Sequence, residues 1–382
     1  MDNHIVIIGS GLAGYNVARE LRKIDKHSPL ALVTSDGGEF YSKPMLSNAL
    51  AAGKTPEAIP ISSAEQMAPQ LNATVRTRAS VTAIDPVLHT IRIGDEALQY
   101  SKLALAIGAC QIRLPFAGDG ADKVLSVNSL DDYRRFRTAL DAGHRIAIVG
   151  GGLIGCEFAN DLAATGHAVD VIDIAGEPLS RLLPDAAGAL LREKLSEAGV
   201  TWHLGTAVER IERADRSLCL RLANGEIVVA NVVLSAIGLK PQTALAGAAG
   251  IAVNRGIVVN RYLETSVQDV YALGDCAEVD GLVLPFVMPI MHAARALAPT
   301  LAGNRTAVAY PAMPVVVKTP ACPTVVAPPP SGATGTWQIE RTDGGMKSLF
   351  VDGRGRLLGL ALNGTAVAER AKLAQQLPSC LA

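Results

Sequence analysis

The sequence predicts an α/β protein with two similar three-layer units, each carrying a β-meander, and a small α+β domain at the C-terminal end. Three observations predict this class. The chain has 382 residues, which exceeds one ordinary domain. About half of its residues (49%) are apolar but only 4% are aromatic, which is typical of parallel sheets covered by helices. The order strand, glycine-rich turn and helix also occurs twice.

The first unit begins at Ile5 with the apolar strand IVII, the glycine run GSGLAG and a helix. A second strand, LALVTSD, is expected to end at Asp36. Short alternating segments with turn signals follow in residues 74–100 and predict a meander. The unit closes on the apolar strand LALAIGA, expected to end at Ala109. This order is typical of a Rossmann-like dinucleotide-binding domain.

The second unit repeats the same order from Ile146. The strand IAIV leads into GGGLIG and a helix, and the next strand, AVDVID, ends at Asp173. Asn224-Gly225 predicts the turn of a hairpin in a second meander. The closing strand VVLSAIGLKP ends at Pro241. Because the whole order is duplicated, we expect both glycine runs to bind dinucleotides rather than to serve packing alone.

The remaining segments connect and follow these units. A Pro/Gly-rich linker, LPFAGDGADK, leads into a helix for which Ser129 is the expected N-cap. An apolar helix is expected from Met288. The tail contains proline-flanked strands, which suit the edge of a sheet, a turn at residues 352–355 and a final helix.

Composition excludes several classes of protein. A net charge of −1 argues against nucleic acid as the main partner. No apolar run is long enough to span a bilayer, and a strand that starts by His4 leaves no room for a signal peptide. The six cysteines form no CxxC motif or zinc spacing, so we expect no metal and small buried thiols. We therefore expect a cytoplasmic protein without membrane insertion.

Each glycine run has the form GxGxxG. The first glycine of such a run allows a tight turn, the second lets the backbone approach a pyrophosphate, and the third lets helix and strand pack closely. The N-terminus of the following helix then favours the anion. The residues expected to bind dinucleotides are Gly9, Gly11, Leu12, Ala13 and Gly14 in the first turn, and Gly150, Gly152, Leu153, Ile154 and Gly155 in the second.

The acid after each second strand can accept hydrogen bonds from a ribose diol, which assigns this role to Asp36 and Asp173. A carboxylate at Asp173 suits a free 2′-hydroxyl and repels a 2′-phosphate. No Arg or Lys follows until Arg181. The second site is therefore predicted to prefer NADH to NADPH.

Longer motifs resemble the pyridine nucleotide–disulfide oxidoreductase superfamily of flavoproteins over almost the full chain. LAIGA resembles the motif that closes the flavin half, and IRLPFAG the arginine-proline linker. GGGLIGCEFA resembles the NADH-site motif with its glutamate, here Glu157. TSVQDVYALGDCAEV resembles the second flavin motif, whose aspartate, here Asp275, binds the ribityl chain. The resemblance implies FAD on the first turn and NADH on the second, with further cofactor contacts from Ala106, Arg113, Gly238, Gly274 and Asp275.

The second flavin motif also implies that the chain returns to the first unit. The expected division is an FAD-binding domain in two parts, 1–112 and 243–311, an NADH-binding domain at 113–242, and a C-terminal α+β domain at 312–382.

Disulfide reductases of this superfamily carry a CxxxxC pair beside the flavin, but the corresponding stretch here, FYSKPMLSNAL, has no cysteine. Electrons must therefore leave the flavin directly. FYSKPMLS and PVVVKTPACP together resemble the rubredoxin–NAD(+) reductases, and flavorubredoxin reductases less closely. Ferredoxin reductases often carry a basic residue after Leu-Ser, where this chain has Asn48, so the flavin-proximal charge is expected at Lys43.

The resemblance implies an enzyme that passes electrons from NADH, through flavin, singly to rubredoxin, an acidic protein, and so supplies an alkane hydroxylase or a similar system. Glu157 and Lys43 are the expected catalytic residues, paired near flavin N5. Lys318 is expected either to approach the isoalloxazine or to be an edge-strand lysine that reaches to solvent. A basic docking surface is expected from Lys43, Arg295 and Lys318.

The sequence also allows other interpretations of the function. The same flavoprotein type includes NADH-dependent ferredoxin or flavorubredoxin reductases and NADH oxidases. An interpretation of another class is a flavin-binding signalling or structural protein that has no catalytic turnover.

Overall fold

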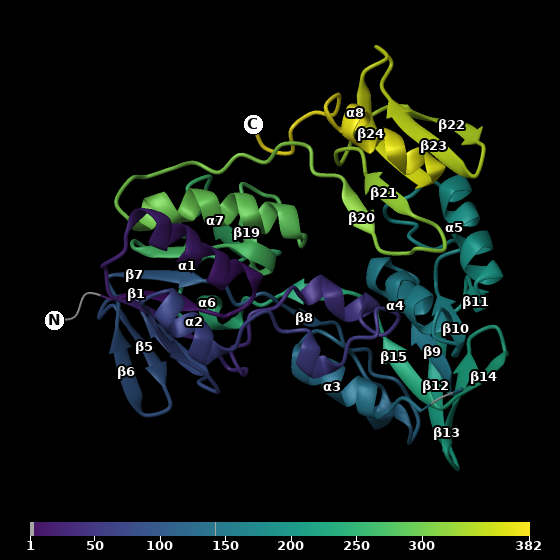
Figure 1. Cartoon of the computed structure of the whole chain (residues 1–382), viewed down its shortest axis with the longest axis horizontal. Coiled ribbons are helices and arrows are strands. Elements are labelled where there is room, and N and C mark those ends of the chain that lie inside the picture. The colour runs from purple at the N-terminus through teal and green to yellow at the C-terminus, as the bar shows by residue number, and fades with distance from the viewer. Residues whose placement is uncertain (1–3, 142) are drawn as a thin grey trace.

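The computed structural model describes residues 4–141 and 143–382 and has three parts (Figure 1). The first part contains a five-stranded parallel sheet in the order β18-β7-β1-β2-β3. Its strands are β1 (Ile5–Ile8), β2 (Leu30–Val33), β3 (Thr74–Arg76), β7 (Lys102–Leu105) and β18 (Val270–Ala272). Because β18 pairs with β7, a segment from late in the chain completes the first sheet.

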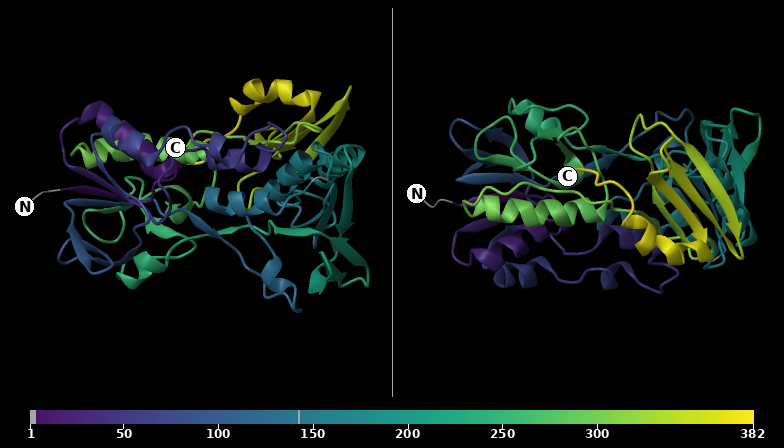
Figure 2. Two further views of the ribbon diagram at one scale, coloured as in Figure 1. Left: turned by 60° about the horizontal axis from the view of Figure 1, so that its bottom comes forward. Right: turned by 90° about the horizontal axis from the view of Figure 1, so that it is seen from above.

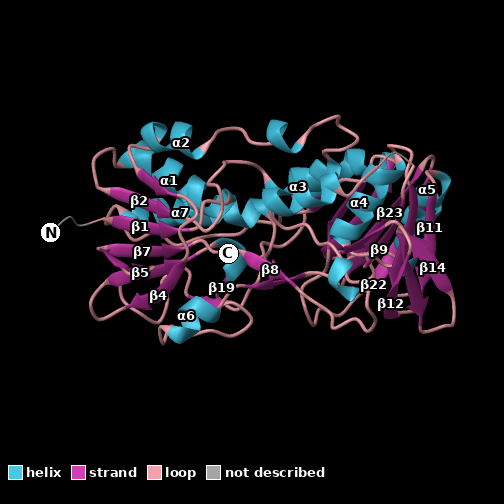
Figure 3. Cartoon of the chain, turned by 90° about the horizontal axis from the view of Figure 1, so that it is seen from below, coloured by secondary structure: helices cyan, strands magenta, loops and turns pink. Residues whose placement is uncertain are grey.

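Helices cover this sheet because its strands are apolar on both faces. All four residues of β1 and of β2 are buried. Figure 3 shows the helices beside the strands, and α1 and α7 pack against each other. The helices of this part are α1 (Leu12–Ile24), α2 (Ala64–Gln70), α6 (Ala244–Ala248) and α7 (Val287–Leu301), and its meander consists of β4 (Val81–Asp85), β5 (Thr90–Ile93) and β6 (Glu96–Gln99).

The second part repeats this architecture with a four-stranded parallel sheet in the order β11-β10-β9-β15. Its strands are β9 (Arg145–Val149), β10 (Ala168–Asp173), β11 (Val200–Leu204) and β15 (Val232–Ser235), and its helices are α4 (Leu153–Ala163) and α5 (Asp185–Glu197). Its antiparallel meander consists of β12 (Val208–Ala214), β13 (Ser217–Leu222) and β14 (Ile227–Ala230).

Short elements join the two parts. β8 (Ala109–Gln111) pairs with β16 (Leu239–Pro241) at the junction of the two parts. β17 (Ile257–Val259) pairs with β19 (Ala277–Val279) within the first part. α3 (Leu130–Thr138) begins at the expected cap, because Ser129 and Asp132 form a reciprocal capping box. The 3₁₀ helices are η1 (Lys43–Asn48), η2 (Pro56–Ala58), η3 (Ala121–Lys123), η4 (Gly274–Cys276) and η5 (Thr365–Glu369).

The third part is an antiparallel sheet in the order β20-β21-β24-β23-β22 with η5 and α8 (Arg370–Ala374). Its strands are β20 (Val315–Val317), β21 (Thr324–Ala327), β22 (Thr336–Thr342), β23 (Gly345–Val351) and β24 (Leu357–Gly364). One face packs on α5 of the second part, where Leu191 joins Val326 and Met346 in one apolar core. Figure 2 shows this sheet beside the second part in both views.

The structure confirms the expected α/β class, the duplicated units with their meanders and the α+β tail, but it corrects several local predictions. β2 ends at Val33 and β7 at Leu105, so Asp36 and Ala109 lie beyond the strands predicted to contain them. The cysteines are not all buried, since Cys380 is exposed and two others are half-buried. Within the described residues, no helix is long and apolar enough to cross a membrane.

Candidate functional site

The two glycine turns have the same geometry. A Cβ atom on the first glycine would lie 2.2 Å from the Ala106 carbonyl oxygen at Gly9 and 2.6 Å from that of Ala236 at Gly150. Both glycines have positive φ, +107° and +113°, where a side chain would be strained. The turn is therefore pressed against the end of the neighbouring strand in each unit.

The second and third glycines differ in what surrounds them. A Cβ at Gly11 or Gly152 would meet no atom within 4 Å, so both positions face open space. At Gly14 and Gly155 it would lie 1.9 Å from the carbonyl oxygen of the first glycine of the same turn. The open second position fits a close approach by a pyrophosphate, and the third allows the helix to pack on the turn. Leu12 and Ala13 begin α1, and Leu153 and Ile154 begin α4.

Each predicted acid is held beside its own glycine turn. Asp36 Oδ1 accepts hydrogen bonds from Ser10 Oγ (3.1 Å), Thr34 Oγ1 (2.7 Å) and the Gly38 amide (3.0 Å). Asp173, the last residue of β10, accepts from the Gly151 amide through Oδ2 and from the Ala175 amide through Oδ1 (2.7 Å). Both carboxylates are thus oriented before any ligand binds.

Asp275 provides a test of whether these residues fit FAD. Among the described residues, its Oδ1 atom is buried without a hydrogen-bond partner. Burial raises the pKa of Asp275, and the positive charge of Lys43 opposes that rise. Such an orphaned buried acceptor is costly unless a ligand donates to it. It therefore fits the hydroxyl groups of a ribityl chain.

Glu157, in the second turn of α4, is the centre of a buried polar cluster. It is only 2% exposed, and its Oε1 atom accepts the Lys318 main-chain N–H at 2.9 Å. Its Oε2 atom accepts from Ser47 Oγ at 2.5 Å and forms an ion pair with Lys318 Nζ. Lys318 Nζ also donates to Ser47 Oγ at 2.9 Å. Three distant segments of the chain therefore meet at one carboxylate.

This cluster corrects the expected pairing of Glu157 with Lys43. Lys318 is the ion-pair partner of Glu157, and Lys43 Nζ instead donates to Asn128 Oδ1 at 3.2 Å. Lys318 comes directly after edge strand β20, and that position turns its side chain back to α4 rather than out to solvent. Ser47 belongs to η1, which begins with Lys43. Lys318 therefore contacts the short helix that contains Lys43.

The next turn of α4 binds two further segments. Asn160 Oδ1 accepts the Ala321 amide at 3.0 Å. Asp161, only 2% exposed, accepts the Leu50 amide at 3.1 Å and the Ala51 amide at 2.9 Å. α4 is therefore attached through side chains to the segment after η1 and to the loop between β20 and β21.

Burial raises the pKa of Asp161 to about 6, although the Ala51 and Leu50 amides oppose the rise. A raised pKa means that the folded chain binds more protons than the unfolded chain between about pH 4 and 6, so stability falls as pH rises through that window. We expect the difference in melting temperature between the wild type and Asp161→Asn (wild type minus variant) to decrease from pH 4 to pH 6 and to stay constant above pH 6. If plots of melting temperature against pH run parallel for the two proteins between pH 4 and 8, this prediction is contradicted.

Four further residues, Ala106, Gly274, Gly238 and Arg113, were predicted to contact the cofactors. Ala106 is buried beside Gly9, and Gly274 packs on Ala13, where its Cβ would lie at 2.9 Å. Gly238 accepts the Ile112 amide at 3.0 Å, and Arg113 is exposed on the connection after β8.

The three cations of the expected docking surface differ in exposure. Of its three cations only Arg295 is exposed, because Lys43 and Lys318 are partly buried and turn to inward partners.

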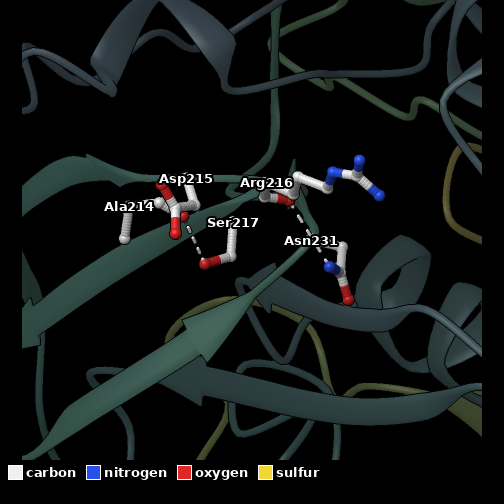
Figure 4. A pocket seen from close by; sticks show the side chains of 5 residues that line it. All are labelled: Ala214, Asp215, Arg216, Ser217 and Asn231. Atoms are coloured by element: carbon white, nitrogen blue, oxygen red, sulfur yellow. Dashed lines mark hydrogen bonds between the residues drawn. The ribbon is translucent and has the colours of Figure 1, made fainter.

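One shallow hollow lies elsewhere, at the β12–β13 turn. Figure 4 shows its lining residues Ala214, Asp215, Arg216, Ser217 and Asn231. Of the bonds drawn there, the one from Ser217 Oγ to the Ala214 carbonyl (2.8 Å) closes the turn. The one from Asn231 Nδ2 to the Arg216 carbonyl (3.5 Å) links the turn to the residue between β14 and β15. Across residues 4–141 and 143–382, no three His, Cys, Asp or Glu side chains are grouped so that they could hold a metal ion.

Comparison with protein families gives two matches. Residues 3–298 match the model described as pyridine nucleotide-disulphide oxidoreductase. The chain belongs to this family. Residues 307–377 match the model described as the rubredoxin binding C-terminal domain, which places Lys318 within that domain. The family confirms FAD and NADH as the cofactors expected from the sequence.

Curated relatives match along the whole chain. The rubredoxin-NAD(+) reductase of Alcanivorax borkumensis is 46% identical over 99% of both chains, and that of Acinetobacter baylyi is 47% identical over 99% of this chain and 98% of its own. A nitric oxide reductase FlRd-NAD(+) reductase of Escherichia coli is 38% identical over 99% of this chain and 100% of its own. Among oxidoreductases of known structure, the reductase fold in the putidaredoxin reductase–putidaredoxin complex matches with a TM-score of 0.88 and 26% identity, covering 99% of this chain and 94% of that one.

Sequence reasoning missed Ser47, Asn128 and Asp161 as members of this polar framework. Ser47 lies inside the motif FYSKPMLS, so its position carried a signal, although its bond to Glu157 did not. Asp161 offered a weaker signal, because a charged residue on the apolar helix α4 needs a buried partner. Asn128 offered none, since asparagine before a helix is ordinarily read as part of a turn.

Proposed function

We propose that this protein is an NADH-dependent flavoenzyme that passes electrons singly from NADH, through FAD, to rubredoxin. One observation carries the proposal. Lys318, inside the segment that matches a rubredoxin-binding domain, is bonded through both its main-chain N–H and its Nζ to Glu157 of α4. The domain for the electron acceptor and the helix of the NADH turn therefore share one polar cluster. The names of the two relatives above 45% identity support the same activity.

The residues divide between the two nucleotides as follows. The first turn with Gly9, Gly11 and Gly14, together with Asp36 and Asp275, would hold FAD. The second turn with Gly150, Gly152 and Gly155, together with Asp173, would hold NADH. When bound, FAD accepts a hydride and releases the electrons one at a time, which a one-electron acceptor requires. The remaining cofactor contacts proposed are Leu12, Ala13, Lys43, Ala106, Arg113, Leu153, Ile154, Glu157, Gly238, Gly274 and Lys318.

Glu157 and Lys43 are the proposed catalytic residues, in separate hydrogen-bonded pairs. Glu157 is held by Ser47 and Lys318, so its carboxylate has a fixed position on the second turn of α4. Lys43 lies near Asp275: burial lowers the pKa of Lys43 and raises that of Asp275, and the charge of each group opposes the shift of the other. Such preorganised charges need no rearrangement during hydride transfer.

We propose the domain division 1–112 and 243–311 for FAD, 113–242 for NADH and 312–382 for the acceptor domain. The membership of β18 in the first sheet supports the return of the chain at 243–311. A cytoplasmic location is proposed from the six free thiols, and an alkane hydroxylase or a similar system is the proposed consumer of the electrons.

An anaerobic comparison of electron acceptors tests the function. Purified protein with NADH should reduce rubredoxin much faster than ferredoxin or oxygen. Faster reduction of ferredoxin, or of a rubredoxin domain fused to a flavodiiron protein, would favour the alternative, an NADH-dependent ferredoxin or flavorubredoxin reductase. The 38% identical E. coli relative motivates the second acceptor. Flavin that stays oxidised under NADH would indicate a protein without turnover.

The choice of nicotinamide provides a further prediction. The wild type should prefer NADH, because the Asp173 carboxylate repels a 2′-phosphate. Asp173→Asn keeps an acceptor for the Gly151 amide but removes the charge, so it should narrow the ratio of kcat/KM for NADH over NADPH by about tenfold, the equivalent of about 1.4 kcal/mol. Steady-state kinetics with both nucleotides measure this ratio. Equal use of the two nucleotides by the wild type would remove Asp173 as the selective group.

A further inference from the structure

The side chain of Asn128 links three segments of the chain, because its amide group donates one hydrogen bond and accepts another. Its Nδ2 donates to the Ala109 carbonyl at 2.8 Å, and its Oδ1 accepts from Lys43 Nζ at 3.2 Å. A carbonyl only accepts and an ammonium only donates, so one orientation of the amide satisfies both neighbours. Asn128 is therefore a connector between the end of the LAIGA segment and the first residue of η1.

The side chain of Asn128 is separate from the cap of α3. The cap uses the main-chain N–H of Asn128, which donates to Asp132 Oδ2 at 3.1 Å, together with the reciprocal bonds of Ser129 and Asp132. A substitution at Asn128 leaves these bonds available. The two side-chain bonds to Ala109 and Lys43 therefore need a reason other than starting the helix.

The hydrogen-bond partner of Lys43 is a neutral amide, whereas the partner of Lys318 is the carboxylate of Glu157. Within the described part of the chain, Lys43 forms no ion pair, and Asn128 is its hydrogen-bond partner. Burial lowers the pKa of Lys43, while the more distant carboxylates of Asp275, Asp36 and Asp132 oppose the shift. An amide can hold such an ammonium group in place without cancelling its charge, whereas a carboxylate would neutralise it.

We propose that Asn128 is a positioning residue that holds the Lys43 ammonium in place without neutralising it, so that its full positive charge acts on the reduced flavin. This inference rests on the proposed function, because that proposal places Lys43 beside the flavin. A positive charge there favours the reduced, anionic ring and so raises the midpoint potential of the flavin.

The test is an anaerobic spectroelectrochemical titration of the flavin, which needs neither NADH nor rubredoxin. Asn128→Asp places a carboxylate against Lys43 and should shift the midpoint potential to more negative values. Asn304→Asp is the matched control, since Asn304 is exposed after the C-terminal end of α7 and receives the same change of charge. Its potential should equal that of the wild type. An unchanged potential in Asn128→Asp would overturn the proposal.

A second variant keeps the proposal testable if the aspartate disturbs folding. Asn128→Leu removes both side-chain bonds at similar volume and should slow flavin reduction by NADH about tenfold, which corresponds to one lost hydrogen bond to a charged group. In a Lys43→Met background, Asn128→Leu should cause no further slowing, because the charge it positions is absent. Equal slowing in both backgrounds would show that Asn128 acts only on structure.

Failure of this inference differs from failure of the proposed function. If Lys43→Met shifts the potential but Asn128→Asp does not, Asn128 loses its role and Lys43 keeps its place beside the flavin. If Lys43→Met leaves the potential unchanged, the placement of Lys43 fails, and with it the role of Asn128. Rubredoxin reduction by the wild type decides the function independently of both results.

Discussion

Asp275→Ala is expected to purify with little bound FAD. The Oδ1 atom of Asp275 is buried without a partner among the described residues, and burial keeps its pKa high. A ligand that donates to this carboxylate gains a hydrogen bond to a charged group, which is worth about 1.5–3 kcal/mol. Its loss should weaken FAD binding about ten- to hundredfold. The absorbance of the protein-bound flavin, relative to protein concentration, measures this loss directly.

Two further variants make this result specific. Asp275→Asn keeps an acceptor without the charge, so it should retain more FAD than the alanine variant. Asp95→Ala removes an exposed aspartate from the β5–β6 turn in the same part of the molecule and should retain all of it. Normal flavin content in Asp275→Ala would exclude this carboxylate from the FAD site.

Glu157→Gln is expected to slow the reduction of flavin by NADH by at least tenfold while FAD content stays normal. The substitution preserves size but removes the charge that Lys318 and Ser47 hold in position. Lys318 is 25% exposed at its side chain, so water can partly stabilise it after the pair is broken, and we expect the effect on rate to exceed that on stability. Stopped-flow absorbance under anaerobic conditions measures the rate.

A double-mutant cycle shows whether the two residues act together. Lys318→Met should also slow flavin reduction, and the double variant should be less impaired than the product of the two single effects. Glu193→Gln is a suitable control, because Glu193 is an exposed glutamate on α5 of the same part. Independent effects of Glu157 and Lys318, or unchanged rates in both, would make the ion pair a structural link between domains only.

Much of the fold could be predicted from sequence because its signals are local. Each GxGxxG turn stands between an apolar strand and a helix, and the structure has both with matching backbone geometry at Gly9 and Gly150. The cap at Ser129 and the two meanders were predicted for the same reason. Strand ends were predicted less well, since Asp36 and Ala109 continue apolar strands in sequence while the pairing stops earlier.

The polar contacts between distant segments were not predictable in this way. The sequence suggested that Glu157 needs a positive partner, because a buried carboxylate without one is costly. The expected partner was Lys43, whereas the actual partner, Lys318, is 275 residues further along the chain, and local pattern does not rank two lysines at such separations. The packing of the C-terminal sheet on α5 determines which lysine pairs with Glu157, because it brings the end of β20 to the second turn of α4.

The sequence by itself determined the two glycine turns, the acids that follow them and the absence of a cysteine pair from FYSKPMLSNAL, because each of these depends on neighbouring residues and on short-range sterics. Only the tertiary structure decided which groups share a hydrogen bond: Lys318 with Glu157, Asn128 with Lys43, and Asp161 with the Leu50 and Ala51 amides. The physical reason is that a hydrogen bond requires two groups within about 3 Å, and packing of apolar faces, which is insensitive to the identity of distant polar residues, sets that distance.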